Sequence, residues 1–153
     1  MPSWTSRDFL DRHLAHRLGV LRGFRMRAGT EPHEIHCAMK DGALITCRVL
    51  WSLLGVRVDS TQERVPSEPT VVPHFIVFPN LPPTVTVRSI TSLADFQSLR
   101  SAQEIILVLV AANKCVAHLD AYPDHGVTAD ILDRAIEVTL REIDARVRPM
   151  KTT

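Results

Sequence analysis

The segment from Ala112 to His118 holds the residue types best suited to chemistry in this chain. His118 can donate or accept a proton, and Lys114 precedes it by one helical turn on the same face, where it can supply a cation. Cys115 lies three residues before His118, and a Cys/His pair can in principle form a reactive thiolate. A cysteine inside an apolar helix is far more often a small hydrophobic residue, so the histidine and the lysine are the stronger candidates.

Helical geometry limits how these side chains can cooperate. Asn113 and His118 lie about 140° apart on a continuous helix. They converge only if the helix unwinds near Ala117 or if a second subunit contributes its own copy. The alternative is structural: Asn113 and His118 close the helix, with the histidine beside the last carbonyls and the negative end of the helix dipole.

The same segment resembles part of the motif of the HEPN superfamily (higher eukaryotes and prokaryotes nucleotide-binding domains). Proteins of that superfamily are all-α bundles, often dimeric, and many are RNases of toxin–antitoxin and antiviral systems. Their pattern is an arginine, commonly followed by Asn, Asp or His, and then a histidine a few residues later. Asn113 matches the polar position and His118 matches the histidine, whereas Ala112 stands where the family has its arginine.

The resemblance implies a role for each residue. RNA cleavage through the 2′-hydroxyl requires a proton donor or acceptor and a cation on the phosphate. His118 would be the general acid or base, Lys114 the phosphate cation in place of the absent arginine, and Asn113 the residue that positions the substrate. The implied protein is a homodimer of a bacterial or phage defence system that binds RNA or a partner protein, with weak or absent RNase activity.

Two groups of side chains contain potential metal ligands. They are His33, His36 and Cys37 at the start of a predicted helix, and His118, Asp120, Asp124 and His125 around a predicted loop. Neither group has the ligand spacing of a recognised zinc site. We therefore expect no metal and no cofactor.

The first predicted helix is rich in arginine, which could contact the phosphates of a nucleic acid. Its arginines are Arg7, Arg12, Arg17, Arg22, Arg25 and Arg27. Most are five residues apart and spiral around the helix, so only Arg7, Arg22 and Arg25 share a side. These three are the candidate contacts with RNA or a partner protein, and the alternative is a solvated helix surface.

The composition is that of an ordinary globular protein. The chain has 153 residues, of which 45% are apolar and 23% charged, about the size of one domain. Its net charge of +1 means that RNA binding would need a local basic patch. Three cysteines without a CxxC pair, and no basic-then-apolar leader, predict a cytoplasmic protein. The longest apolar run, Ile105 to Ala112, is far shorter than a membrane span.

Hydrophobic periodicity predicts that residues 1–29 form a helix, capped by Thr5 or Ser6 and stopped by Gly29. The apolar stripe of this helix consists of Leu10, Leu14, Leu18, Leu21 and Phe24. Gly19 and Gly23 each cost roughly 1 kcal/mol relative to alanine inside a helix. We expect them to mark close packing against another helix.

A second helix is predicted to begin at Thr30-Glu31-Pro32 and to stop at Gly55. One face of it is apolar and widens toward its end. The face consists of Ile35, Met39, Gly42, Ile45, Val49 and Leu53, joined by Leu50, Trp51 and Leu54.

Residues 56–91 hold six of the ten prolines, which excludes a long helix there. The runs Phe75–Phe78 and Thr84–Val87 are β-prone, so a small hairpin or two extended crossing segments should pack on the helices.

A third helix is predicted from a cap at Thr91 or Ser92 to the candidate catalytic segment. It is apolar on nearly every side from Ile105 to Ala112, so it should be the central and most buried element. The fourth helix runs from Thr128 to Arg148-Pro149, and its stripe is Leu132, Ala135, Thr139, Ile143 and Val147.

The predicted fold is a single all-α domain over residues 1–153, a four-helix bundle with a Pro-rich extended segment or small β-hairpin between helices two and three. Two functions are compatible with it. One is the HEPN-like, RNA-binding or partner-binding domain. The other is a non-catalytic scaffolding or oligomerisation subunit of a larger complex, in which the apolar third helix and the Pro-rich segment build an oligomer interface.

Overall fold

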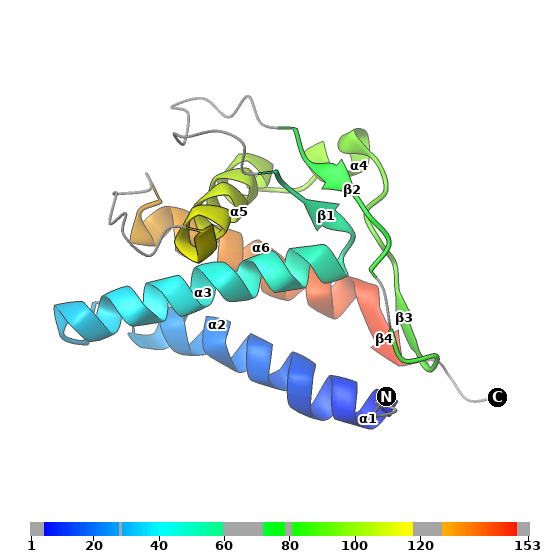
Figure 1. Ribbon diagram of the computed structural model, residues 1–153, viewed down its shortest axis with the longest axis horizontal. Coiled ribbons are helices and arrows are strands. Elements are labelled where there is room, and N and C mark those ends of the chain that lie inside the picture. Colours follow the sequence, from blue (N-terminus) through cyan, green and yellow to red (C-terminus); the bar gives the residue numbers. More distant parts are fainter. Residues whose placement is uncertain (1–4, 28, 60–71, 79–80, 118–126, 150–153) are drawn as a thin grey trace.

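The computed structural model describes residues 5–27, 29–59, 72–78, 81–117 and 127–149 (Figure 1). This part of the chain is mostly helical and also contains small antiparallel strand pairs. The elements in chain order are α1 (Ser6–Asp8), the π-helix η1 (Phe9–Leu14), α2 (Ala15–Arg27), α3 (His33–Leu53), β1 (Val56–Arg57), β2 (His74–Phe75), β3 (Val85–Val87), α4 (Leu93–Gln97), α5 (Ala102–Ala117), α6 (Ala129–Arg146) and β4 (Val147–Pro149).

The first helix consists of α1, η1 and α2 in direct succession. Thr5 caps it as predicted, because the Thr5 hydroxyl oxygen accepts the backbone N–H of Asp8 at 3.1 Å. The same hydroxyl donates to the Asp8 carboxylate at 2.6 Å, and this bond lowers the pKa of Asp8 below its ordinary value. The predicted stripe is confirmed: Leu14, Leu21 and Phe24 are buried, and Leu10 and Leu18 pack partly buried against the same core.

Gly55 ends α3, as predicted, and also anchors the segments that follow. Its φ of +90° suits glycine, and a Cβ there would lie 3.0 Å from the Ile76 carbonyl oxygen and 3.1 Å from that of Ile90. The Gly55 carbonyl accepts the N–H of Ile76 at 2.8 Å, and the Leu54 carbonyl accepts that of Ile90 at 2.8 Å. The end of α3 therefore holds two distant stretches of the Pro-rich segment in place.

In the described parts of the Pro-rich segment, the two β-prone runs do not form a hairpin with each other. β2 pairs with β1 after α3, with Val56 opposite Phe75. β3 pairs with β4, which continues directly from α6, with Val87 opposite Val147. The two β-prone runs do not pair with each other, because Phe75 pairs with Val56 at the start of the same segment and Val85–Val87 pair with residues 147–149 after α6.

The predicted third helix is broken, so the expectation of one continuous helix was wrong. Ser92 does cap its first part, since its hydroxyl oxygen accepts the N–H of Asp95 at 3.1 Å. That part, α4, ends where the Ser98 hydroxyl donates to the Asp95 carbonyl at 2.7 Å. Ser101 then adopts a φ of +62°, which no α-helix accommodates, before α5 begins. Serine side chains that bond to nearby backbone compete with the helix, and this stretch shows the effect.

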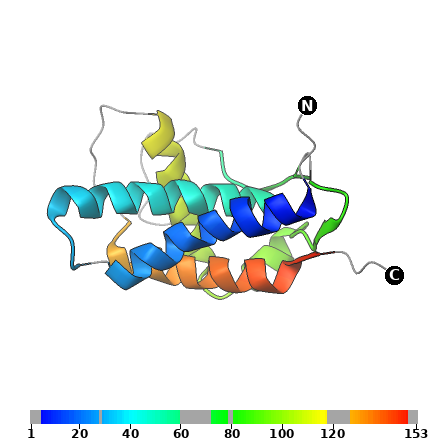
Figure 2. The same ribbon diagram turned by 90° about the horizontal axis from the view of Figure 1, so that it is seen from below.

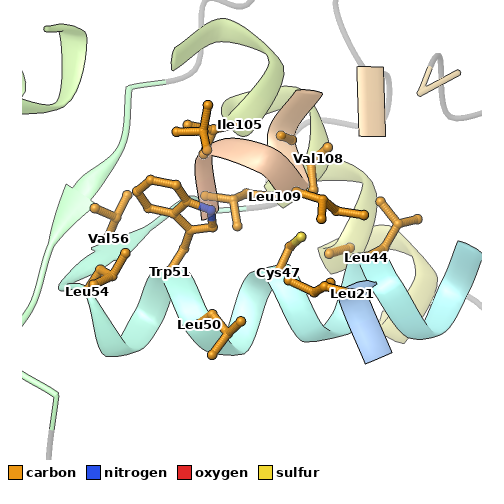
Figure 3. Packing of buried hydrophobic residues seen from close by; sticks show 14 of the residues in the cluster. Leu21, Leu44, Cys47, Leu50, Trp51, Leu54, Val56, Ile105, Val108 and Leu109 are labelled. Carbon is orange, nitrogen blue, oxygen red and sulfur yellow. The ribbon is translucent and has the colours of Figure 1, made fainter. Parts of the chain in front are cut away.

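The core lies where α5 meets α3 and α6, as expected of the most apolar helix. From Ile105 to Ala112 every side chain of α5 is buried except the half-buried Leu107. In Figure 3, Cys47 and Trp51 project from α3 toward α5, where Leu109 is among the residues they approach. The predicted stripe of α6 is buried as well, and Thr128 caps that helix as expected by accepting the N–H of Ile131 at 3.2 Å.

Polar groups inside this core are paired. The Trp51 indole N–H donates to the Thr139 hydroxyl at 2.8 Å, and that hydroxyl donates to the Ala135 carbonyl at 2.7 Å. Trp51 also meets Phe96 of α4 edge to face, with ring centroids 6.0 Å apart. Burial raises the pKa of the nearby Cys47 thiol to about 12, so this thiol stays protonated at ordinary pH.

The helices are not arranged as predicted in detail. α2, α3 and α6 follow the long axis of the molecule, whereas α5 runs across α3 (Figure 2). A mostly helical domain is therefore confirmed, while the simple four-helix bundle is not, because the central helix crosses its neighbours. No helix in the described ranges is long and apolar enough to cross a membrane.

Candidate functional site

The predicted catalytic residues lie at or beyond the end of α5. The half-buried side chain of Asn113 donates a hydrogen bond through Nδ2 to the Val58 carbonyl, which joins α5 to the segment after β1. The backbone of Lys114 belongs to α5, but its side chain and all of His118 lie outside the described residues. Asn113 therefore has a visible positioning role within the fold, and the catalytic assignment of the three residues stays a prediction.

The three candidate arginines differ in their ion-pair partners. Arg7 pairs with Asp11 at 3.3 Å, and both side chains are exposed. Arg25 binds Asp133 of α6 at 2.7 Å, so it joins α2 to α6. Arg22 has no ion pair within the part of the chain that the structure describes. The wider turn of η1 lies between Arg7 and Arg22, so the 100° periodicity that put them on one side does not hold across it.

The three potential metal ligands at the start of α3 do not share one set of neighbours. The Cys37 sulfur lies 3.7 Å from His33 Nε2, whereas the His36 ring packs against Phe24 at a centroid distance of 5.9 Å. Among the described residues, no three potential ligands gather around one point. His118, Asp120, Asp124 and His125 lie outside those residues.

A groove with a volume of about 990 Å³ lies between α2 and α3. We call it the α2–α3 groove. Its lining is almost entirely apolar, and the apolar side chains that shape it are Val20, Phe24, Met26, Ile35, Ala38 and Met39. Met26 is 82% exposed and Ile35 is 49% exposed, although both are large hydrophobic residues. Exposed apolar side chains gathered in a groove are typical of a binding surface.

The groove explains a difference between the predicted and the observed faces of α3. The side chains that α3 buries in the core include Ala43, Cys47 and Trp51. The predicted apolar face begins instead with Ile35 and Met39, which lie along the groove. The open part of α3 is therefore its first turns, where Ile35 and Met39 line the groove, whereas Leu53 on the same side near the end of the helix is buried.

Three of the residues that line the groove are glycines, which contribute no side chain to it. Gly19 and Gly23 of α2 and Gly42 of α3 line it, and a Cβ at any of them would meet no atom within 4 Å. The close helix packing expected at Gly19 and Gly23 is therefore not made within the described residues. The spacing Gly19-xxx-Gly23 is the sequence signal that could have located the groove, because residues four apart share one helix face.

The two walls of the groove carry opposite charge. Arg22 and Arg27 come from α2, and Glu31 and Glu34 come from the start of α3. Arg27 and Glu31 pair with each other at 3.6 Å where the two helices are connected. Arg22 and Glu34 are exposed, and neither has an ion pair among the residues described. The basic wall and the acidic wall therefore each keep one charge available.

No protein-family model, curated protein or solved structure matches this chain. The features from which a function can be inferred are therefore the α2–α3 groove and the residues at the end of α5.

Proposed function

We propose that this protein is a non-catalytic interaction module that binds an α-helix in the α2–α3 groove. The observation that carries the proposal is the exposure of Met26 and Ile35 on the two walls of the groove. A Cβ built at any of the glycines between them would have no other described part of the chain within 4 Å. A partner helix that laid its apolar face there would cover both side chains. The hydrophobic effect favours such burial in proportion to the apolar area removed from water.

The glycines make a helix the best-fitting occupant. With no side chain at Gly19 and Gly23, one face of α2 exposes its backbone along a full helical turn. Small residues at this spacing allow the backbone of a second helix to approach closely. An extended peptide would need a sheet edge with free backbone groups, and the backbone groups of α2 and α3 are bonded within the helices.

The lining favours binding over catalysis. Its polar side chains are two arginines and two glutamates, and no histidine, cysteine, serine or lysine lines the described groove. The apolar face of α5, which the scaffolding hypothesis assigned to an oligomer interface, is already buried inside the chain. The groove is therefore the better candidate for the interaction surface of such a subunit.

A photo-crosslinking experiment tests this proposal. Benzoylphenylalanine placed at Met26 should form a covalent adduct of defined mass in cells that produce the chain. Val77, which is 92% exposed but lies outside the groove, is the matched control position. The Met26 adduct should disappear with Ile35→Glu and should not form from position 77. Equal labelling at both positions, or an adduct that survives Ile35→Glu, would contradict the proposal.

RNA binding by a HEPN-like domain is the second candidate function. It is supported by the Asn113 and His118 pattern and by Arg22, which is exposed and lacks an ion pair among the described residues. In this alternative His118 is the acid or base and Lys114 the phosphate cation. His118→Ala should then abolish every RNA-dependent activity, and unchanged activity would remove this candidate.

A further inference from the structure

We infer that the helix bound in the α2–α3 groove belongs to a second copy of this chain, so that the protein forms a two-fold symmetric homodimer. The inference rests on the proposed function and adds the identity of the partner. It follows from how the charges are distributed across the groove.

A two-fold interface brings the same surface of both copies together, so the surface has to complement itself. The α2–α3 groove meets this requirement because one wall offers Arg22 and the other offers Glu34. A partner of different sequence would require a complementary pattern that nothing in this chain specifies. A second copy supplies it by symmetry.

The orientation of the two copies follows from the same charges. A two-fold axis along the groove places α2 of one copy opposite α3 of the other. Arg22 of each copy then faces the acidic wall that holds Glu34 of the other, which gives two equivalent ion pairs. Arg27 and Glu31 pair with each other inside each chain and leave this arrangement undisturbed.

The apolar part of the groove fits the same arrangement. Met26 lies on the α2 wall and Ile35 on the α3 wall, so a copy related by this axis sets each of them against the opposite wall. The open surface at Gly19, Gly23 and Gly42 admits the incoming side chains, because no other described part of the chain lies within 4 Å of where a Cβ at these glycines would be. The dimer would cover Ile35 and Met39 on the first turns of α3, which the isolated chain leaves only partly buried.

Charge reversal provides a direct test. In sedimentation velocity runs over a range of concentrations, we expect the unmodified chain to form a dimer. Arg22→Glu leaves an unpaired acid on both walls and Glu34→Arg leaves an unpaired base on both walls, because Arg27 and Glu31 remain paired. Each variant alone should therefore raise the dissociation constant about tenfold or more. In an equimolar mixture of the two variants every altered charge faces its opposite, so the dimer should return. Recovery on mixing separates a lost contact from a folding defect.

Two further variants serve as controls. Arg100→Glu changes an exposed arginine outside the groove, and it should leave the dissociation constant unchanged. Gly23→Leu fills open space without an intrachain clash at Cβ, so it should keep the helical circular dichroism spectrum and prevent dimer formation.

The outcomes distinguish this inference from the proposed function. A dimer that responds to the groove variants supports both. A chain that stays monomeric at every concentration, yet gives a groove-dependent Met26 adduct with a different protein, overturns only the second-copy assignment. A dimer unaffected by Arg22→Glu, Glu34→Arg and Gly23→Leu also overturns this assignment. A monomer with no Met26 adduct overturns both proposals.

Discussion

The later turns of α3, which face the core, and its first turns, which line the groove, differ in how completely the chain covers them. On the core side, Trp51 is fully buried and its indole N–H is bonded to Thr139. On the groove side, Ile35 is about half exposed and Gly42 faces open space. Both parts are apolar in sequence, so the difference arises from what packs against them. An apolar helix face that its own chain leaves open indicates a partner, and the following substitutions measure that contrast.

Truncation of one side chain in the core, Trp51 of α3, and one in the groove, Met26 of α2, should give the largest difference. Trp51→Ala removes a fully buried side chain and a buried hydrogen-bond donor, so it should lower the free energy of unfolding by about 3–5 kcal/mol. Met26→Ala, at a side chain that is 82% exposed, should change it by less than about 0.5 kcal/mol in the monomer. Urea denaturation followed by circular dichroism measures both. Similar losses for the two variants would mean that the groove side is already covered.

The ion pair at the end of α6 should show the next largest effect. Arg146 Nε bonds the Glu142 carboxylate at 2.7 Å with both side chains nearly buried, and Arg146 also donates to the Arg88 carbonyl at 3.2 Å. Arg146→Met removes the closest positive charge from the nearly buried Glu142 carboxylate. It should therefore lower the free energy of unfolding by about 3 kcal/mol.

The matched control for this pair is exposed. Arg148 lies 3.9 Å from Asp144 on the same helix end, and both side chains are largely in solvent. Arg148→Met should therefore lower the free energy of unfolding by less than about 1 kcal/mol. If the two arginines prove equivalent, the end of α6 is more hydrated than its burial indicates.

Alanine at two glycines should have opposite effects. Gly55→Ala places a Cβ at positive φ and 3.0 Å from the Ile76 carbonyl oxygen, so it should destabilise the chain by about 1–3 kcal/mol. Gly23→Ala fills open space in a helix, so it should stabilise the monomer by about 0.5–1 kcal/mol. Thermal unfolding at concentrations below the dimer dissociation constant compares them. A loss of stability with Gly23→Ala would mean that another part of the chain packs against Gly23 and would contradict the open space there.

The buried thiol gives a pH dependence of smaller size. Burial raises the pKa of Cys47 from 9.0 to about 12, so the unfolded chain releases the thiol proton at a lower pH than the folded chain does. Stability from this group is therefore complete below pH 9 and is lost as the pH rises toward 12. The free energy of unfolding should be lower at pH 10 than at pH 8, by on the order of 1 kcal/mol.

Cys47→Ala is the control for this titration. It should remove the additional slope while leaving the contributions of other titrating groups in place, so the slopes rather than the absolute stabilities are compared. An identical slope in both chains would show that the Cys47 thiol already reaches solvent in the folded state.

Local features of the fold could be predicted from the sequence, whereas distant pairings could not. Thr5, Ser92 and Thr128 cap helices as predicted, because a cap depends only on residues within one turn. The apolar stripe of α6 is buried because a single period governs it. The partner of β3 lies beyond α6, and the crossing of α5 over α3 depends on the shapes of both surfaces.

The candidate site shows the same division. Periodicity showed that Ile35 and Met39 belong to an apolar face, but it does not tell what covers that face. The spacing of Gly19 and Gly23 indicated a helix contact, but the open space above them shows that the chain itself does not make it. At the end of α5, the sequence suggested a role in chemistry for Asn113, and its bond to the Val58 carbonyl depends on tertiary structure.

The pairing of β3 with β4 has a consequence for protein synthesis. Residues 85–87 emerge from the ribosome well before residues 147–149, so β3 has no strand partner until most of α6 has been made. During that interval Val85 and Val87 form an uncovered strand edge, the kind of surface that nascent chains use to aggregate and that chaperones bind. In a chain stalled on the ribosome within α6, helices α2 and α3 should therefore already be able to pair. The partner strand of β3 has not yet been synthesised at that point.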